Sequence, residues 1–165
     1  AASLALTLTA CGPGQDAPTR MIKQVTDGVE LSIQDNGVDI EVLNLLLVAT
    51  ETGDAVLVGT IVNQGAQADQ LLGIAVGGNT ATITGDVALN QNAPLSFEGE
   101  SANAKAVFAG VSPVAGRHVK LTLGFARAGM VTAEVIIRDK RDAYKDVTSG
   151  TTPAVTSSPD SQPLQ

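Results

Sequence analysis

The side chains that could carry nucleophilic, acid–base or soft-metal chemistry are few in this chain of 165 residues. It has one cysteine, Cys11, and one histidine, His118, and its two methionines are Met21 and Met130. A thiol can act as a nucleophile or accept a lipid, and imidazole and thioether groups suit soft copper ions. The surroundings of these four side chains decide which of those chemistries the sequence can support.

Cys11 ends a stretch of apolar and small residues. A leucine-rich run at residues 4–8 precedes it, and Gly-Pro-Gly at residues 12–14 follows. Gly-Pro-Gly would break a helix or strand passing through the cysteine, which disfavours the alternative of a short core segment. The stretch resembles the signal of bacterial lipoproteins, in which a diacylglycerol is joined to the cysteine sulfur and the preceding peptide is removed. The resemblance implies that Cys11 is the lipid-attachment residue and that residues 1–10 are the remnant of a signal peptide.

Composition excludes several classes of protein. The formal net charge of −7 argues against nucleic acid as a partner, because a phosphate-binding face needs clustered Lys and Arg. A single cysteine excludes an internal disulfide framework. No run of about 20 apolar residues follows Cys11, so the sequence predicts that the lipid is the only membrane attachment. Aromatic residues make up only 2% of the chain, so Val, Leu, Ile and Ala must build the core.

No pattern typical of an enzyme active site occurs in the sequence. His118 lies in a polar turn at the start of a predicted strand, where a surface position is expected. The chain has no Gly-x-Ser-x-Gly, Cys-x-x-Cys, His-Glu-x-x-His or Gly-x-Gly-x-x-Gly pattern, and no phosphate-binding loop ending in Lys-Ser/Thr. Residues 35–39 offer oxygen ligands for calcium, but the twelve-residue loop is incomplete and a hairpin turn is the better interpretation. The sequence therefore predicts a protein that is not an enzyme.

Short β-rich runs separated by turn signals fill the middle of the chain. Residues 119–125 form the clearest one, with Val119, Leu121, Leu123 and Phe125 on one face. For residues 38–50 a helix is the weaker alternative to a strand, because that run is rich in β-branched residues. Strands at this spacing favour an all-β fold, an antiparallel Greek-key sandwich of the immunoglobulin or cupredoxin kind. The predicted strands cover residues 29–33, 38–50, 55–62, 71–76, 81–84, 95–97, 106–111, 119–125 and 131–137.

These elements give a division of the chain into four parts. Residues 1–10 are the signal remnant, and residues 11–27 are the lipidated cysteine with a flexible tether. Residues 28–138 form the sandwich domain. Residues 139–165 are expected to be a disordered tail, first charged and then rich in Ser, Thr and Pro. A glycosylated or partner-contacting tail is the alternative, and a passive terminus is the favoured interpretation.

Several of the strands carry a family resemblance. Residues 56–63, 68–74, 82–86 and 119–125, in this order and spacing, are similar to the actinobacterial lipoprotein family LpqE. The resemblance implies a lipid-anchored accessory subunit of the cytochrome bc1–aa3 respiratory supercomplex, on the outer face of the cytoplasmic membrane. It also implies two partners, the membrane itself and a membrane protein complex.

More distantly, the layout is similar to periplasmic copper chaperones of the PCu(A)C type. These hold Cu(I) with His nitrogen and Met sulfur, and the resemblance would place their first histidine near residues 86–89 and a His-x-Met pair near residues 105–108. Neither stretch contains such a donor. Met21 falls in the predicted tether and Met130 in a predicted turn, so no metal site and no cofactor are expected.

The sequence thus favours a non-enzymatic, lipid-anchored interaction module. Two alternatives stay open: a copper-chaperone-like lipoprotein, and an envelope lipoprotein that binds a small ligand or lipid in a pocket of the sandwich.

Overall fold

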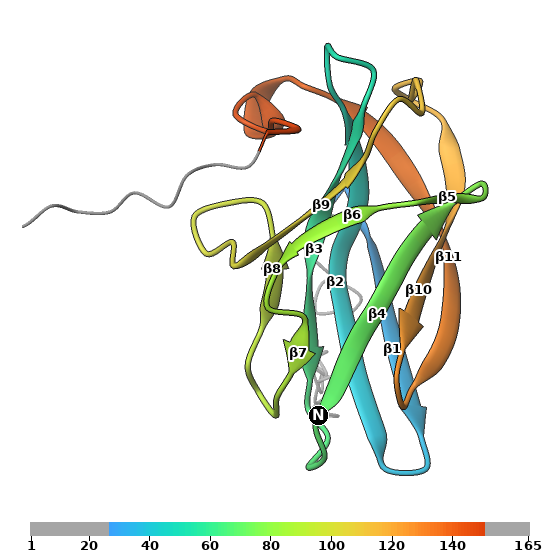
Figure 1. Cartoon of the computed structure of the whole chain (residues 1–165), viewed down its shortest axis with the longest axis vertical. Coiled ribbons are helices and arrows are strands. Elements are labelled where there is room, and N and C mark those ends of the chain that lie inside the picture. Colours follow the sequence, from blue (N-terminus) through green and yellow to red (C-terminus); the bar gives the residue numbers. More distant parts are fainter. Residues whose placement is uncertain (1–26, 151–165) are drawn as a thin grey trace, which may run out of the picture.

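The computed structural model describes residues 27–150, which fold almost entirely into β-strands (Figure 1). Cys11, Met21, the rest of residues 1–26 and the tail from residue 151 lie outside the described residues. Within the described range, no helix is long and apolar enough to cross a bilayer. The strands are β1 (Val29–Asp35), β2 (Val38–Ala49), β3 (Ala55–Asn63), β4 (Asp69–Val76), β5 (Asn79–Thr80), β6 (Thr82–Gly85), β7 (Ala88–Leu89), β8 (Leu95–Phe97), β9 (Ala104–Phe108), β10 (His118–Phe125) and β11 (Gly129–Asp139), followed by a 3₁₀ turn, η2 (Asp142–Tyr144).

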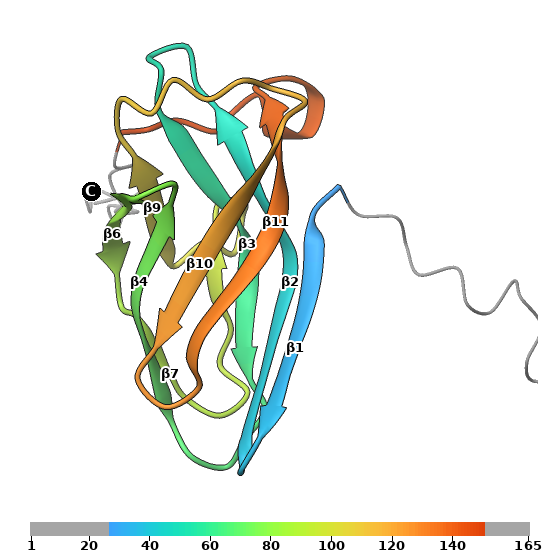
Figure 2. The same ribbon diagram turned by 90° about the vertical axis from the view of Figure 1, so that its right-hand side faces the viewer.

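Two groups of strands face each other (Figure 2). In the first group β4, β10 and β11 pair antiparallel, and β5 and β7 extend it along β4. The second group contains β2, β3, β8, β9 and β6, with β1 beside β2. The end of β11 pairs in parallel with β2, with Ile137 opposite Leu47, and this pairing joins the two groups. The arrangement is a β-sandwich closed along one side, which confirms the predicted fold class.

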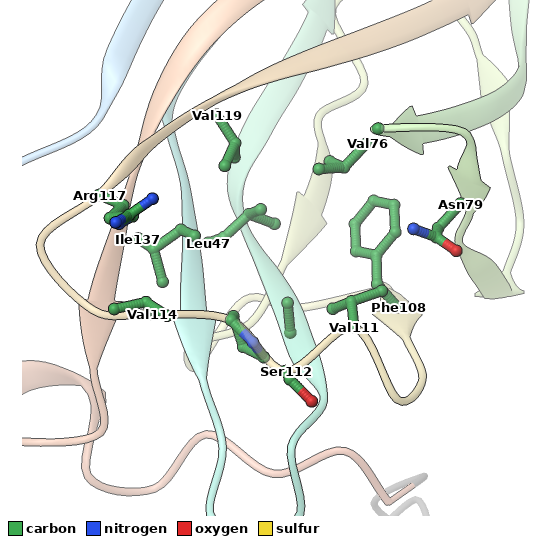
Figure 3. Close-up of a pocket in the computed structure, with 13 residues that line it drawn as sticks. Leu47, Val76, Asn79, Phe108, Val111, Ser112, Val114, Arg117, Val119 and Ile137 are labelled. Carbon is green, nitrogen blue, oxygen red and sulfur yellow. The ribbon is translucent and has the colours of Figure 1, made fainter.

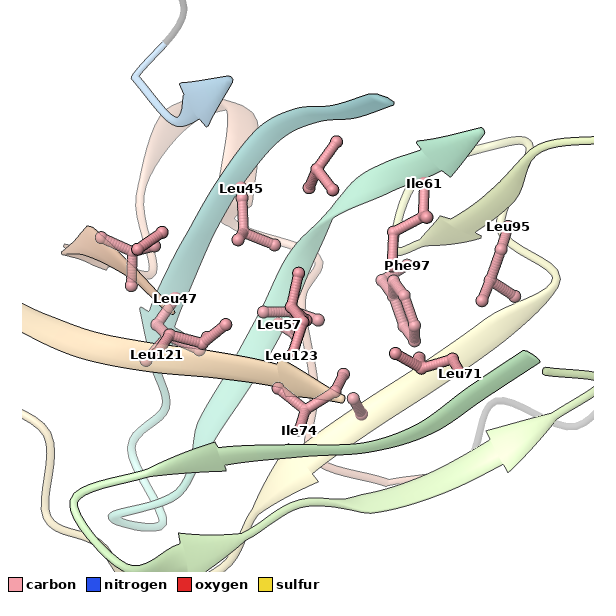
Figure 4. Close-up of a cluster of buried hydrophobic side chains, with 14 of the residues drawn as sticks. Leu45, Leu47, Leu57, Ile61, Leu71, Ile74, Leu95, Phe97, Leu121 and Leu123 are labelled. Carbon is pink, nitrogen blue, oxygen red and sulfur yellow. The ribbon is translucent and has the colours of Figure 1, made fainter. Parts of the chain in front are cut away.

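One apolar core lies between the two groups. Figure 4 shows Ile74 of β4 and Leu123 of β10 facing Leu57 of β3, and all three are almost completely buried. Burying a leucine contributes about 1.5–3 kcal/mol, so such layers stabilise the fold without a disulfide. The alternate residues predicted for the inward face of residues 119–125 do face this core. Residues 38–50 form a strand rather than a helix, and Asn36-Gly37 forms the hairpin turn that the sequence predicted.

A β-bulge at Asn44 divides β2 into two halves. The pairing with β3 moves from Leu43–Thr60 to Leu46–Val58, so β2 contains one extra residue. Asn44 has a φ of 51°, and its Oδ1 accepts a hydrogen bond from the Gly28 amide at 2.9 Å. Beyond the bulge the inward face changes from even to odd positions. β2 pairs with β1 from Val38 to Val42 and again at Leu45, and with β11 from Leu47 to Ala49.

The second half of β2 also buries its other face. Leu46 and Val48 form a small cluster that is covered by Val147 and Tyr144 of the C-terminal segment. Burial and the neighbouring Asp27 raise the pKa of Tyr144, whose hydroxyl donates a hydrogen bond to Asp27 at 3.2 Å.

The domain therefore extends beyond the boundary that the sequence suggested at residue 138. The strand β11 continues to Asp139, and the charged stretch after it turns through η2 and buries Val147. The reason is that the outer face of β2 is apolar, and this segment covers it. The composition of the segment alone does not reveal that contact.

Candidate functional site

The structure describes two of the four chemistry-bearing side chains, and it places them far apart. His118 is exposed at the start of β10, opposite Ile136 of β11. Met130 is 81% exposed and pairs with Gly124, six residues further along β10 (118 to 124). Six residues of strand span about 20 Å, so these two side chains cannot hold the same ion. Cys11 and Met21 lie outside the described residues.

The two stretches where the family resemblance would place copper ligands contain apolar side chains that belong to the core. Leu89 in the first stretch and Ala106 and Phe108 in the second are almost completely buried. Lys105 in the second stretch forms a largely buried ion pair with Glu98. Residues 27–150 contain no cluster of three or more His, Cys, Asp or Glu side chains that could bind a metal. Neither stretch therefore offers a soft donor to copper.

The buried polar side chains of the described domain hold backbone in place. The Asp69 carboxylate accepts hydrogen bonds from the amides of Gln70, Arg127 and Ala128 at 2.7–2.9 Å. The Asn63 amide group donates to the Gln67 and Leu89 carbonyls at 2.8 and 2.9 Å. Both groups use their polar atoms within the fold, so they are not free to act on a substrate.

An apolar pocket of about 240 Å³ opens at one end of the sandwich (Figure 3). The floor comes from strands of both groups, with Leu47 of β2 and Ile137 of β11 among its residues, and the loop of residues 109–117 forms one wall. Among the residues that line it, Arg117 is the only ionisable one. The full lining consists of Leu47, Ala55, Val76, Gly77, Asn79, Phe108, Val111, Ser112, Pro113, Val114, Arg117, Val119 and Ile137.

The loop of residues 109–117 is held in place by hydrogen bonds at both of its ends. Asp54 accepts from the Gly110 amide at 2.9 Å, and the Ser112 amide donates to the Gly53 carbonyl at 2.9 Å. At the other end, the Gly116 amide donates to the Ile137 carbonyl at 2.7 Å. The hydrogen bond from Gly110, followed by those from the Thr52 and Ser149 hydroxyls, lowers the pKa of Asp54. These hydrogen bonds fix the loop that forms one wall of the pocket.

A second feature lies on the outer face of β4, β10 and β11, near the turn between the last two strands. Leu72, 65% exposed on β4, and Met130 on β11 both point outward. Gly124 of β10 lies between the two strands, paired with Met130 and with Gly73, and Gly73 adjoins Leu72 on β4, so neither position adds a side chain. Two strand spacings separate β4 from β11 by about 10 Å, so the glycines form a shallow floor between two apolar side chains. We call these four residues the Leu72–Met130 patch.

The next row of the same face is polar. The hydroxyls of Thr122 and Thr132 lie 2.9 Å apart and share a hydrogen bond. An apolar centre with a polar border is typical of the surfaces through which proteins bind each other.

Comparison with known proteins finds solved structures that share this fold. No family model and no curated protein matches the chain. Among solved structures, the copper-bound PCuAC domain from PmoF2 matches with a TM-score of 0.56 and 18% identity, over 67% of this chain and 98% of that one. The apo PCuAC domain from PmoF1 matches with a TM-score of 0.55 and 23% identity, over 67% and 99%. At these identities the likeness establishes a shared fold: the described domain has the β-sandwich of PCuAC domains, as the distant resemblance in the sequence predicted.

Proposed function

We propose that this protein is a non-enzymatic binding module on the outer face of the cytoplasmic membrane, anchored through lipidated Cys11, that uses its PCuAC fold for protein contact. The observation that carries the proposal is the Leu72–Met130 patch. Large apolar side chains at 65% and 81% exposure cost solvation free energy, and a partner that covers them recovers it. The glycine floor between them lets a partner backbone or side chain approach closely.

The partner that we propose is the cytochrome bc1–aa3 supercomplex, which the resemblance to the LpqE family implies. A lipid anchor restricts the module to the membrane surface and raises its local concentration beside membrane complexes. A small patch can then suffice, because the second contact in a two-point attachment is effectively intramolecular.

The test is a tagged pull-down from gently solubilised native membranes, with quantitative mass spectrometry of the retained proteins. We expect cytochrome bc1 and aa3 subunits in near-stoichiometric amounts. The double variant Leu72→Lys with Met130→Lys should retain at least tenfold less of them, whereas Leu43→Lys, an exposed strand leucine outside the patch, should not. Equal recovery by both variants would remove the patch from the interface, and absence of both complexes from the wild-type sample would remove the partner.

The anchor is tested separately by Cys11→Ala. We expect this variant to leave the membrane fraction and to keep the circular dichroism spectrum of the wild-type domain, because Cys11 lies outside the described β-strands. A variant that remains in the membrane fraction would show that another segment provides the attachment.

A second candidate function is copper handling, and the fold comparison is the observation that favours it. The similar solved structures are PCuAC domains, and that of PmoF2 binds copper. Against this, apolar core residues occupy the two stretches expected to carry ligands, and His118 and Met130 lie about 20 Å apart along the strand. We therefore place protein contact before copper handling.

Titration of the full chain carrying Cys11→Ser with Cu(I), in competition with a chromophoric chelator, separates the two candidates, because the substitution removes a thiol that would itself bind Cu(I). Under the first proposal the chain takes up no stoichiometric ion at nanomolar free copper. A nanomolar one-to-one site would establish copper handling instead, and loss of that site in Met21→Ala, His118→Ala or Met130→Ala would identify the donors.

A further inference from the structure

We infer that the pocket at the end of the sandwich binds the acyl chain of a single-chain anionic amphiphile, with Arg117 contacting its anionic head group. This site is distinct from the Leu72–Met130 patch and goes beyond the protein-contact function proposed above. It lies where β2, β9, β10 and β11 meet the loop of residues 109–117 (Figure 3).

The lining determines the chemistry of the tail. Leu47, Phe108 and Ile137 are almost completely buried core residues that reach the bottom of the pocket, and Val111 and Val119 extend the same apolar wall. Water in such a pocket would find few hydrogen-bond partners, whereas methylene groups would find van der Waals contact on several sides. A volume of about 240 Å³ is below the range typical of drug-sized ligands, so a narrow chain suits it better than a ring system.

Arg117 determines the charge of the head group. It is the only ionisable side chain among the lining residues, and its guanidinium has no ion-pair partner within the described part of the chain. The alternation of β10 turns Arg117 and Val119 toward the pocket while His118 points away. A guanidinium at the end of an apolar pocket complements a carboxylate or phosphate attached to an alkyl chain. Figure 3 shows Arg117 beside Ile137 and Val114 at the edge of the apolar lining.

The loop of residues 109–117 forms an ordered, partly apolar entrance to the pocket. Val114, on the loop, is 57% exposed and is one of the few large apolar side chains of the described domain that lie outside the core. The hydrogen bonds of Gly110, Ser112 and Gly116 fix both ends of the loop, so the entrance does not need to order when a ligand binds.

The source of the ligand follows from where the chain enters the domain. The Oδ2 atom of Asp27, the first described residue, lies 3.5 Å from a guanidinium nitrogen of Arg138, and Arg138 directly follows Ile137 of the pocket. A tether that continues from Asp27 to a lipidated Cys11 would hold this end of the sandwich near the bilayer. This step, unlike the pocket itself, rests on the proposed lipid anchor.

The test titrates the full chain carrying Cys11→Ser with decanoate, decanol and decyltrimethylammonium by isothermal calorimetry. We expect saturable one-to-one binding of decanoate, weaker binding of decanol and none of the cation. Octanoate should bind more weakly than decanoate by about fourfold for each methylene that leaves the pocket. No saturable binding of decanoate, or equal binding of the cationic amphiphile, would overturn the proposal.

Two variants and one control connect the binding to the pocket. Arg117→Gln should weaken decanoate about tenfold and leave decanol unchanged, whereas Arg127→Gln, which changes an exposed arginine at the other end of β10, should alter neither. Val119→Phe fills the pocket without changing charge and should abolish binding of both. Thermal unfolding checks that each variant folds. Unchanged decanoate affinity in a folded Val119→Phe variant would place the ligand elsewhere and overturn the assignment.

A competition with lysophosphatidylglycerol distinguishes the two sources of this chemistry. Displacement of decanoate indicates a membrane lipid, and failure to displace it indicates a free fatty acid; both outcomes retain the site. The ligand-binding proposal and the protein-contact proposal can also be refuted independently of each other. Val119→Phe should not affect the pull-down, and the Leu72→Lys with Met130→Lys variant should not affect decanoate binding.

Discussion

The two ends of the β10–β11 hairpin are built in opposite ways. At the turn end, the buried Asp69 carboxylate accepts hydrogen bonds from three backbone amides, two of them in the turn itself. At the other end, the loop of residues 109–117 is held by hydrogen bonds at its two ends and encloses an apolar pocket. The turn end uses a buried carboxylate to hold its backbone, and the hollow beside it is lined partly by polar residues, Asp35, Asn36 and Arg127. The pocket end gives up some packing and gains a cavity that can take a ligand.

The largest loss of stability is expected for a substitution at Asp69, and it tests the contrast between the two ends most directly. Asp69→Ala leaves the amides of Gln70, Arg127 and Ala128 without an acceptor in a buried setting, and should lower the free energy of unfolding by about 3 kcal/mol. Urea denaturation followed by circular dichroism measures the loss.

Asp69→Asn is the matched control for the carboxylate. One amide oxygen can still accept from Gln70 and Arg127, as Oδ1 does in the structure, but its nitrogen cannot accept from Ala128. We expect an intermediate loss. If Asp69→Ala costs less than 1 kcal/mol, the turn does not depend on this carboxylate.

At the pocket end, truncation should cost little. Val114→Ala and Arg117→Ala remove exposed side chains with no ion pair among the described residues, and each should change the free energy of unfolding by less than about 0.5 kcal/mol. The same urea experiment applies. A loss near 2 kcal/mol for either variant would mean that the loop contributes to stability as the turn does, and the contrast between the two ends would disappear.

The smallest effect concerns the attachment of the loop through Asp54. Hydrogen bonds from Gly110 and from two hydroxyls lower the pKa of this exposed carboxyl below the 3.8 of an unperturbed aspartate. The contribution of Asp54 to stability is therefore present above pH 3.8 and lost as the pH falls through its lower folded-state pKa. We expect the amide chemical shift of Gly110 to titrate with a midpoint below 3.8. In Asp54→Asn this titration should vanish, and a midpoint above 3.8 would contradict the hydrogen bond.

The sequence predicted the strands well wherever apolar residues alternate. Residues 119–125 are the best example, because every second side chain is buried in one core and the pattern depends on the strand alone. The turn at Asn36-Gly37 was predictable for a similar reason, since its positive φ angles favour these two residue types.

Features that depend on contacts between distant parts of the chain were not predictable in this way. The bulge at Asn44 changes which residues of β2 face inward, and only pairing on both sides of the strand reveals it. The pocket combines Leu47, Phe108 and Ile137, which are far apart in sequence, and each alone resembles an ordinary core residue. Val147 lies in a polar stretch whose composition favours a tail, although it covers the outer face of β2.

The contact between Asp27 and Tyr144 brings the two limits of the described domain together. A domain whose ends meet can be inserted into a loop of another protein, or circularly permuted, with little disturbance to its strands. A force applied between these two points would first load the contacts of Asp27 with Tyr144 and Arg138. The sandwich can therefore be carried as a unit between whatever segments precede and follow it in a chain.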